Sequence, residues 1–267
     1  MIKVGILGAN GRMGRVLIEA AHAHNKTALG FASVRANSSF IGMDAGELAG
    51  IARQHISVSE ISSDTIEHAD VLIDFTLPEA LGQNLRLAVD AQKPIVIGTT
   101  GLNKDQLNMI DEAAKYIPVV FAANYSVGIN LMLNLVKQAA TVMGNDADIE
   151  IIEGHHRFKK DSPSGTAMAI GHSIADSLGR DLDKCAIYGR EGVSDERRRE
   201  TIGFATVRAG DIVGDHTALF ATLGERLEIT HKASSRLTFA NGALTASCWI
   251  KEQAKGLYSM QDVLGLV

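Results

Sequence analysis

The sequence contains few cysteines, few prolines and few aromatic residues for its length. Two cysteines and four prolines occur among 267 residues, and aromatic side chains make up 5%. Cys185 and Cys248 lie far apart and form no CxxC pair, which argues against a disulfide framework and against a cysteine zinc site. We therefore expect two free thiols in a reducing compartment.

Long apolar runs and an excess of positive charge are also missing. No stretch approaches the roughly 18 apolar residues of a membrane-spanning helix, and the chain begins with the strand-like segment 2–7 rather than a signal peptide. The formal net charge of −5 argues against nucleic acid as a partner. With 46% hydrophobic and 21% charged residues, the composition is typical of a soluble globular protein. We expect a cytoplasmic protein with no membrane partner.

A glycine-rich turn follows the first apolar segment. Residues 2–7 are suited to a buried strand, the sequence GANGRMG occupies 8–14, and apolar residues at helical spacing follow. Strand, glycine turn and helix in this order favour dinucleotide binding, although a plain β–α turn is the alternative. Gly8 would permit the tight turn, Gly11 would let the backbone approach a pyrophosphate, and Gly14 would let helix and strand pack closely.

Strand-like and helix-like segments alternate through the first half of the chain. Strands are expected near 28–33, 71–75, 95–97 and 119–122, helices at 78–88 and about 103–115, and an irregular loop at 36–55. This alternation predicts a parallel sheet, whose ligands bind beyond the carboxyl ends of its strands. Arg35 follows the second strand, where the residue that reads the adenosine ribose is expected, and Val34 before it offers no carboxylate.

The pattern changes after a helix that begins near residue 127. Strand-like segments with partial period-two alternation occur at 149–153, 204–208, 217–221 and 227–231. Few helices separate the later ones, which predicts a second domain with an open, mixed or antiparallel sheet. The charged stretch 191–200 is expected to be an exposed loop, and the tail from residue 235 is helix-like.

The stretch 153–166, EGHHRFKKDSPSGT, concentrates positive charge in an acidic protein. Ser162 or Ser164 can cap a helix that starts here, with Pro163 in its first turn. A helix N-terminus favours an anion, so we expect a carboxylate or phosphate ligand. A solvated surface loop is the alternative. We expect no metal, because adjacent residues of an extended segment point to opposite faces and no nearby Cys or His completes a site.

Five segments together resemble the 4-hydroxy-tetrahydrodipicolinate reductase (dihydrodipicolinate reductase) family of the lysine and diaminopimelate pathway. They are residues 8–14, 98–101, 122–126, 153–166 and 229–236. The resemblance runs essentially end to end, and the His-His…Lys…Pro-Ser-Gly-Thr block is its most specific part. It implies an oxidoreductase that uses NADPH or NADH, a cyclic dicarboxylate substrate and a homotetramer.

The resemblance also implies two domains. A Rossmann-like, parallel-sheet dinucleotide domain would comprise residues 1–126 and 236–267. A second α+β domain with a mixed open sheet, residues 127–235, would serve substrate binding and oligomerisation. The return of the chain to the first domain is implied by the resemblance alone.

Site residues are carried over from the family's motifs in the same way. His155 would be the acid–base residue and Lys159 the proton donor, with His156, Gly165 and Thr166 binding substrate. The cofactor would be lined by Gly8, Ala9, Asn10, Gly11, Arg12, Met13, Gly98, Thr99, Thr100, Ala122, Ala123, Asn124 and Tyr125. Many family members carry an acidic residue where this chain has Val34, so we expect Arg35 to contact the cofactor and NADH not to be preferred.

The residues suit the chemistry that the family carries out. Reducing a C=C bond conjugated to a ring imine needs a hydride, which the cofactor supplies, and a proton. Lys159 is a cationic donor and His155 exchanges protons near neutral pH, so both remain candidates for delivering the proton. Two alternatives stay open: another two-domain NAD(P)-dependent dehydrogenase of amino-acid precursors, and a non-catalytic dinucleotide sensor.

Overall fold

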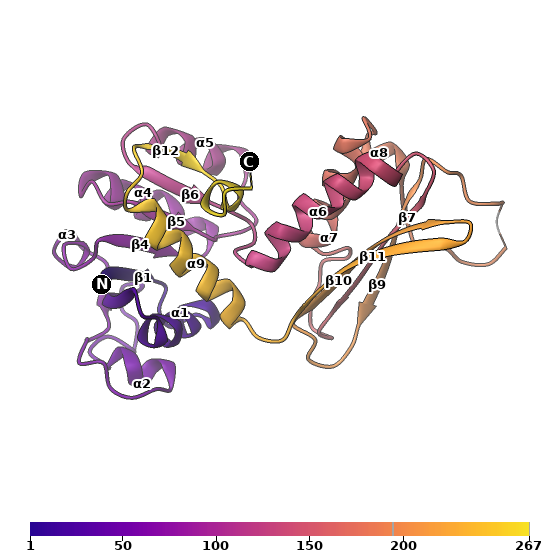
Figure 1. Cartoon of the computed structure of the whole chain (residues 1–267). Helices are drawn as coiled ribbons and strands as arrows, with labels where there is room; N and C mark the ends of the chain where they lie inside the picture. Colours follow the sequence, from indigo (N-terminus) through magenta and orange to yellow (C-terminus); the bar gives the residue numbers. More distant parts are fainter. Residues whose placement is uncertain (194, 267) are drawn as a thin grey trace. The chain divides into compact units, whose positions relative to one another are not determined.

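The structure, a computed structural model, describes residues 1–193 and 195–266. The chain forms two compact units: unit 1 is Met1–Val127 with Arg236–Val267, and unit 2 is Gly128–Ser235. Figure 1 shows that the chain leaves unit 1 and later returns to it, so that the N-terminal (indigo) and C-terminal (yellow) segments belong to the same unit. No helix among the described residues combines the length and the apolar character needed to cross a membrane.

Unit 1 is built on a parallel sheet, as predicted. Its seven described strands follow the order β12-β6-β5-β4-β1-β2-β3, and every neighbouring pair is parallel. The strands are β1 (Ile2–Leu7), β2 (Thr27–Val34), β3 (Ser59–Glu60), β4 (Val71–Asp74), β5 (Ile95–Ile97), β6 (Pro118–Phe121) and β12 (Gly256–Tyr258). The edge strands β3 and β12 were not predicted, because two or three residues are too few to show a period.

Helices pack on both faces of this sheet. They are α1 (Arg12–Ala23), α2 (Ala45–Ala49), α3 (Ser63–Ile66), η1 (Pro78–Ala80), α4 (Leu81–Asp90), α5 (Lys104–Ala113), α9 (Leu237–Ile250) and α10 (Met260–Val263). Alternate residues of one strand enter different cores: Ile73 packs with α1 and α9, whereas Leu72 packs with α4 and α5. Burial on both faces explains why these strands read as continuous apolar runs. The predicted loop 36–55 contains the short helix α2, so that prediction was incomplete.

Gly8 and Gly14 have the roles that the sequence predicted, in the tight turn and in helix–strand packing respectively. Gly8 adopts a positive φ of 71°, which L side chains rarely tolerate. A Cβ atom at Gly14 would lie 2.3 Å from the carbonyl oxygen of Gly8 and 2.7 Å from the Cα atom of Ala9. The helix can therefore approach the strand this closely only because residue 14 has no side chain.

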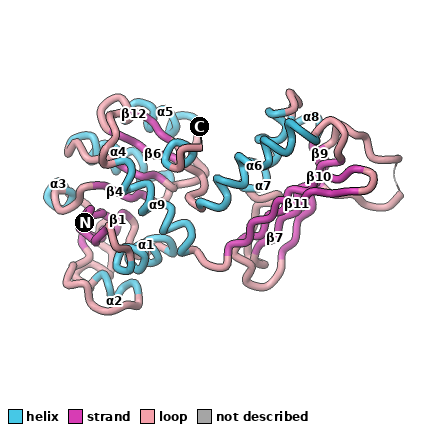
Figure 2. Tube along the Cα trace, in the orientation of Figure 1, coloured by secondary structure: helices cyan, strands magenta, loops and turns pink. Residues whose placement is uncertain are grey.

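Unit 2 contains the predicted mixed sheet, in the order β11-β10-β7-β9-β8. Strand β10 is antiparallel to β7 and β11, whereas β7 and β8 are parallel to β9. The elements are α6 (Val127–Met143), β7 (Asp148–His155), α7 (Gly165–Ser177), α8 (Leu182–Cys185), β8 (Ala186–Tyr188), β9 (Ile202–Arg208), β10 (Gly214–Thr222) and β11 (Glu225–Ala233). Figure 2 shows the long helices α6 and α7 beside the strands. Alternate apolar residues of β7, β9 and β10 join α6 and α7 in one core. The helices of the described part of unit 2 thus cover one face of its sheet and leave the other without a helix.

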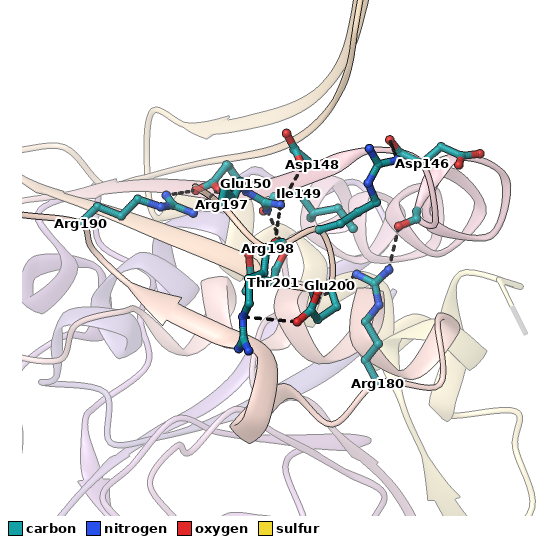
Figure 3. A network of polar contacts seen from close by, with 12 residues as sticks. Asp146, Asp148, Ile149, Glu150, Arg180, Arg190, Arg197, Arg198, Glu200 and Thr201 are labelled. Atoms are coloured by element: carbon teal, nitrogen blue, oxygen red, sulfur yellow. Dashed lines mark hydrogen bonds and ion pairs between the residues drawn. The ribbon is translucent and has the colours of Figure 1, made fainter. Parts of the chain in front are cut away.

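The charged segment 191–200, expected to be an exposed loop, is tied to the sheet through one arginine. The guanidinium of Arg197 donates to Asp148 at 2.8 Å, to Glu150 at 3.1 Å, and to the carbonyl oxygens of Ile149 and Thr201 at 2.9 and 2.8 Å (Figure 3). Arg190 also contacts Glu150. The expectation of a solvated loop was therefore wrong for Arg197, whose side chain is mostly buried.

We expect Arg197→Ala to destabilise the protein by about 1–3 kcal/mol, because carboxylate and carbonyl oxygens would lose a charged donor. Arg198→Ala is the matched control in the same segment. Its exposed side chain pairs with Glu200 at 3.4 Å, and an exposed pair contributes about 0–1 kcal/mol. Urea unfolding of both variants measures the difference. Equal losses of unfolding free energy would show that the Arg197 contacts add nothing to stability.

Candidate active site

The glycine turn presents the open N-terminus of α1. Gly11 is the N-cap residue, no side chain caps the helix, and its first turn contains no acidic residue. The amide groups and the dipole of such an N-terminus attract a phosphate. Arg12 and Met13 begin the helix, and the half-buried Asn10 and the buried Ala9 precede it. The turn thus fits the pyrophosphate of a dinucleotide.

A buried carboxylate organises the neighbouring strand ends. Asp74, at the end of β4, is fully buried. One carboxylate oxygen accepts from the backbone N–H and hydroxyl of Thr76, at 2.8 and 2.6 Å, and from the hydroxyl of Thr99 at 3.3 Å, while the other accepts from Asn84 at 2.9 Å. These donors compensate the cost of burying the charge. Asp74 therefore positions the predicted segment Gly98–Thr100, although the sequence argument did not single it out.

The predicted segment Ala122–Tyr125 is anchored by its tyrosine. The Tyr125 side chain is buried, with its hydroxyl 2.9 Å from the carbonyl oxygen of Ile97 and 3.1 Å from that of Val120. Burial raises the pKa of this hydroxyl well above its ordinary value. Because the side chain is buried in the core, only backbone atoms of Tyr125 are available to contact a cofactor.

Arg35 has the predicted position. It follows β2 directly and is exposed, next to the buried Val34. A second cation of this region, Arg53, is instead engaged in an ion pair with Glu47 at 3.0 Å. Arg35 is thus accessible to a ligand at the end of the second strand.

In unit 2, the end of β7 carries a buried carboxylate–histidine pair. Glu153 and His155 are two residues apart on an extended strand and so share one face. Their exposed fractions are 1% and 8%. His155 Nδ1 lies 2.6 Å from Glu153 Oε2. His155 was predicted from the sequence, whereas its carboxylate partner Glu153 was not.

Glu153 has further partners from three other segments. Arg208 of β9 binds both of its oxygens, at 2.9 and 2.8 Å. The backbone N–H of Ser164 and the hydroxyl of Thr206 donate at 3.1 and 3.3 Å. Burial acts to raise the pKa of Glu153, but the hydrogen bonds from Arg208, His155 and Ser164 outweigh it, so the pKa is lowered. The carboxylate is therefore ionised at neutral pH.

The pKa of His155 is lowered, first by burial. Glu153 acts in the opposite direction, whereas the positive charges of Lys159 and Arg208 lower it further. The ring of His216, buried on β10, stands edge-on to His155 at 5.1 Å between ring centroids. Burial and the neighbouring His155 lower the pKa of His216 to about 4. His216 is thus neutral at physiological pH.

The loop after β7 carries the other predicted side chains. Lys159 is mostly buried, and its ammonium group pairs with Asp161 at 2.9 Å. His156 Nδ1 accepts the backbone N–H of Phe158 at 3.2 Å. A neutral His156 therefore carries its proton on Nε2, where it can donate to an acceptor such as a carboxylate.

Helix α7 begins at Gly165, with Ser164 as its N-cap. The Ser164 hydroxyl accepts from the Ala167 N–H at 3.1 Å and lies 3.1 Å from His216 Nε2. Pro163 precedes the cap, so the prediction that it lies in the first turn was wrong: Glu153 and His216 hold Ser164, rather than Ser162, at the capping position. A Cβ atom at Gly165 would meet nothing within 4 Å. The space beside Gly165, at the start of the helix, could therefore accommodate an anion.

The predicted catalytic and substrate residues thus lie in unit 2, and the predicted cofactor residues lie in unit 1. Three supporting residues were missed, namely Glu153, Arg208 and His216, whereas Ser164 was one of the two predicted caps. An acidic residue two positions before a strand-end histidine was a usable signal for Glu153. Arg208 and His216 are brought in by strand register alone, opposite His155 and Glu153 respectively. Within the described part of the chain, no group of three His, Cys, Asp or Glu side chains is arranged to hold a metal ion.

Comparison with known proteins places the whole chain in one family. Residues 2–125 match the family model described as dihydrodipicolinate reductase, N-terminus, and residues 128–264 match the one described as dihydrodipicolinate reductase, C-terminus. A curated relative, the 4-hydroxy-tetrahydrodipicolinate reductase of Pseudoalteromonas atlantica, is 64% identical over 266 residues, which cover 100% of both chains.

Solved structures share the fold. A dipicolinate-bound dihydrodipicolinate reductase from Paenisporosarcina sp. TG-14 aligns with a TM-score of 0.75 and 23% identity over 98% of each chain. A probable dehydrogenase from Thermotoga maritima aligns with a TM-score of 0.62 and 12% identity, over 98% of this chain and 92% of that one. With both family models matched along its length and a curated relative at 64% identity, this chain belongs to the dihydrodipicolinate reductase family.

Proposed function

We propose that this chain catalyses the NAD(P)H-dependent reduction of 4-hydroxy-tetrahydrodipicolinate to tetrahydrodipicolinate in lysine and diaminopimelate biosynthesis. The observation that carries the proposal is the 64% identity, over the full length of both chains, to a reductase of that name. The buried Glu153–His155 pair, with Lys159 on the loop that follows, supports an acid–base role in unit 2.

The cofactor is NADPH or NADH, held by unit 1. The open N-terminus of α1, with Gly11 as its N-cap, would take the pyrophosphate. The strand ends at Gly98–Thr100 and Ala122–Tyr125 would line the remainder, with Asp74 fixing Thr99. When bound, the nicotinamide supplies the hydride.

Unit 2 binds the dicarboxylate substrate and supplies the proton. The start of α7 at Gly165 and Thr166 takes one carboxylate, since the dipole and the first amides of a helix attract an anion. His156 donates from Nε2 to the same group or to the second carboxylate. Lys159 leaves Asp161 to approach the substrate, and either Lys159 or His155 delivers the proton.

The direct test follows NADPH absorbance with the substrate generated in situ from pyruvate and aspartate semialdehyde by the enzyme that condenses them. We expect oxidation only when both precursors and this chain are present. Oxidation with aspartate semialdehyde or homoserine alone would instead indicate another dehydrogenase of amino-acid precursors. Cofactor binding without any turnover would indicate a dinucleotide sensor.

A homotetramer in the cytoplasm completes the proposal. Assembly is supported by the sheet face of unit 2 that its helices leave uncovered, where Ile152 and Val207 are exposed. Both cysteines, Cys185 and Cys248, are free, which suits a reducing compartment. Light scattering of the purified protein tests for four chains per particle.

We expect the wild type not to prefer NADH, and Arg35→Ala to lose roughly tenfold or more in kcat/KM with NADPH but little with NADH. The reason is that a charge-assisted contact to the 2′-phosphate contributes on the order of 1.5–3 kcal/mol, and Val34 offers no carboxylate to repel that phosphate. Arg53→Ala is the matched control, because Arg53 pairs with Glu47. Both cofactors are assayed at one ionic strength. Equal losses with both cofactors would exclude Arg35 as the residue that reads the phosphate.

A further inference from the structure

The Glu153 carboxylate binds Nδ1 of His155 and takes no direct part in the proposed reaction. We propose that Glu153 is a positioning residue: it keeps a proton on His155 Nδ1 and thereby makes Nε2 the atom that exchanges protons with the substrate. The catalytic consequence of this inference rests on the proposed reductase activity. The placement of the proton rests on the contacts of Glu153.

The two oxygens of Glu153 are surrounded by donors. Oε1 accepts from Ser164 N–H, the Thr206 hydroxyl and one Arg208 nitrogen, and Oε2 accepts from the other Arg208 nitrogen. His155 Nδ1 lies 2.6 Å from Oε2. An ionised carboxylate can only accept, so a hydrogen bond at this distance requires the proton on Nδ1. Neutral His155 therefore has an unprotonated Nε2.

Nε2 of His155 lies close to Gly214 at the start of β10. A Cβ atom at Gly214 would lie only 3.2 Å from it. A side chain at residue 214 would therefore crowd the nitrogen that has to meet the substrate. Glu153 thus binds Nδ1, while the glycine at position 214 leaves space beside Nε2.

Arg208 limits how strongly the charge of Glu153 stabilises the protonated form of His155. The groups that face His155 are Glu153 on β7, Arg208 on β9, His216 on β10 and Lys159 on the following loop. The charge of Glu153 is thus opposed by those of Arg208 and Lys159, and Lys159 in turn pairs with Asp161. The carboxylate orients the imidazole, while its charge is shared with the guanidinium. His155 can then take up a proton at Nε2 and release it again near neutral pH.

The proton balance is simple. Protonated His155 breaks its Nε2–H bond as the substrate atom that accepts the proton forms its own bond to hydrogen. The ring is left neutral with its proton on Nδ1, still bound to Glu153, and solvent returns a proton to Nε2. Glu153 also accepts the N–H of Ser164, the N-cap of α7. One carboxylate therefore sets the acid–base nitrogen relative to the helix start that is proposed to bind the substrate.

The wild-type enzyme provides a test that needs no activity. Long-range ¹H–¹⁵N spectra of labelled protein distinguish the two nitrogens of each neutral histidine, and the His155 signals are those lost in His155→Gln. We expect neutral His155 to carry its proton on Nδ1. A proton on Nε2 instead would overturn the inference.

Glu153→Gln tests the consequence for the reaction. Its amide oxygen suits the Oε1 position, where three donors converge. The NH₂ group then faces His155 Nδ1 and also the Arg208 nitrogen that donates to Oε2 in the wild type. His155 must then accept at Nδ1 and carry its proton on Nε2, where a neutral ring does not release it. We expect this change of tautomer, turnover at least about 100-fold lower, an unchanged KM for NADPH, and an alkaline limb of the pH–rate profile shifted to lower pH. The shift follows because Glu153 raises the pKa of the acid.

Two further variants separate positioning from mere stability. Glu153→Asp keeps the carboxylate and should restore the Nδ1 proton and part of the turnover. Thr206→Val removes a donor to Oε1 without touching His155, so it should leave the His155 tautomer and the pH profile as in the wild type. If Glu153→Gln shows the wild-type tautomer and the wild-type turnover, the inference is wrong. If that variant does not fold, the wild-type spectrum and the Glu153→Asp variant test the inference instead. An inactive wild type with the proton on Nδ1 would refute the proposed function but not the placement of the proton.

Discussion

Replacing Lys159 by alanine is expected to lower turnover at least about 100-fold, the range in which a positioned proton donor contributes. Lys159 lies on the loop after β7 with its ammonium group held by Asp161. Its charge also acts on His155, so the two groups belong to one electrostatic site. The alanine variant removes both the donor and this positive charge. Stopped-flow or steady-state NADPH oxidation measures the loss.

The control for Lys159 is its neighbour. Lys160 is exposed, so Lys160→Ala should cost less than about tenfold, as expected for a charge largely screened by solvent. NADPH affinity, measured by fluorescence titration, should be close to wild type in both variants, because the predicted cofactor residues belong to unit 1. Near-normal turnover of Lys159→Ala would remove Lys159 from the mechanism.

His155→Gln is expected to lower turnover at least about 100-fold as well, and to change the pH dependence. A general acid works in its protonated form, so activity falls as pH rises through its pKa. Burial lowers the pKa of His155. The alkaline limb of the wild-type profile should therefore lie below the pH at which an ordinary histidine titrates. The glutamine variant should lack this limb.

His172→Gln is the matched control for His155. His172 is exposed on α7, outside the Glu153 network, so its replacement should leave turnover and the pH profile unchanged. A His155→Gln variant that keeps the wild-type alkaline limb would assign the titrating acid to another group, with Lys159 the first candidate. Loss of the alkaline limb in His155→Gln, together with its retention in His172→Gln, would identify His155 as the titrating acid.

The elements of unit 1 that form locally could be predicted well. The strand 2–7, the glycine turn and the following helix were readable because their cause is local: an apolar run, a residue with positive φ and a helical spacing. The same holds for Ser164 as a cap, which was one of two candidates. Residues that are remote in the sequence select Ser164 rather than Ser162 as the cap, because Glu153 accepts the N–H of Ser164 and His216 contacts its hydroxyl.

Short strands were missed for a physical reason. β3, β8 and β12 have two or three residues each, too few for side chains to show which face is buried. They are strands because a neighbouring strand supplies the hydrogen bonds, as β6 does for β12. Arg197 was misjudged in the same way, since its partners on β7 are remote in the sequence.

By itself, the sequence determined that this protein has a parallel-sheet domain with a dinucleotide turn, a second domain with a mixed sheet, and one stretch that carries His155, Lys159 and the start of α7. All three depend on periodicity or on residues adjacent in the chain. Only the tertiary structure decided how His155 is held. Strand register sets Arg208 opposite His155 and His216 opposite Glu153, and the charge of a buried carboxylate is compensated only by donors that folding brings from distant segments. The proton position on His155 follows from that arrangement and from no local pattern.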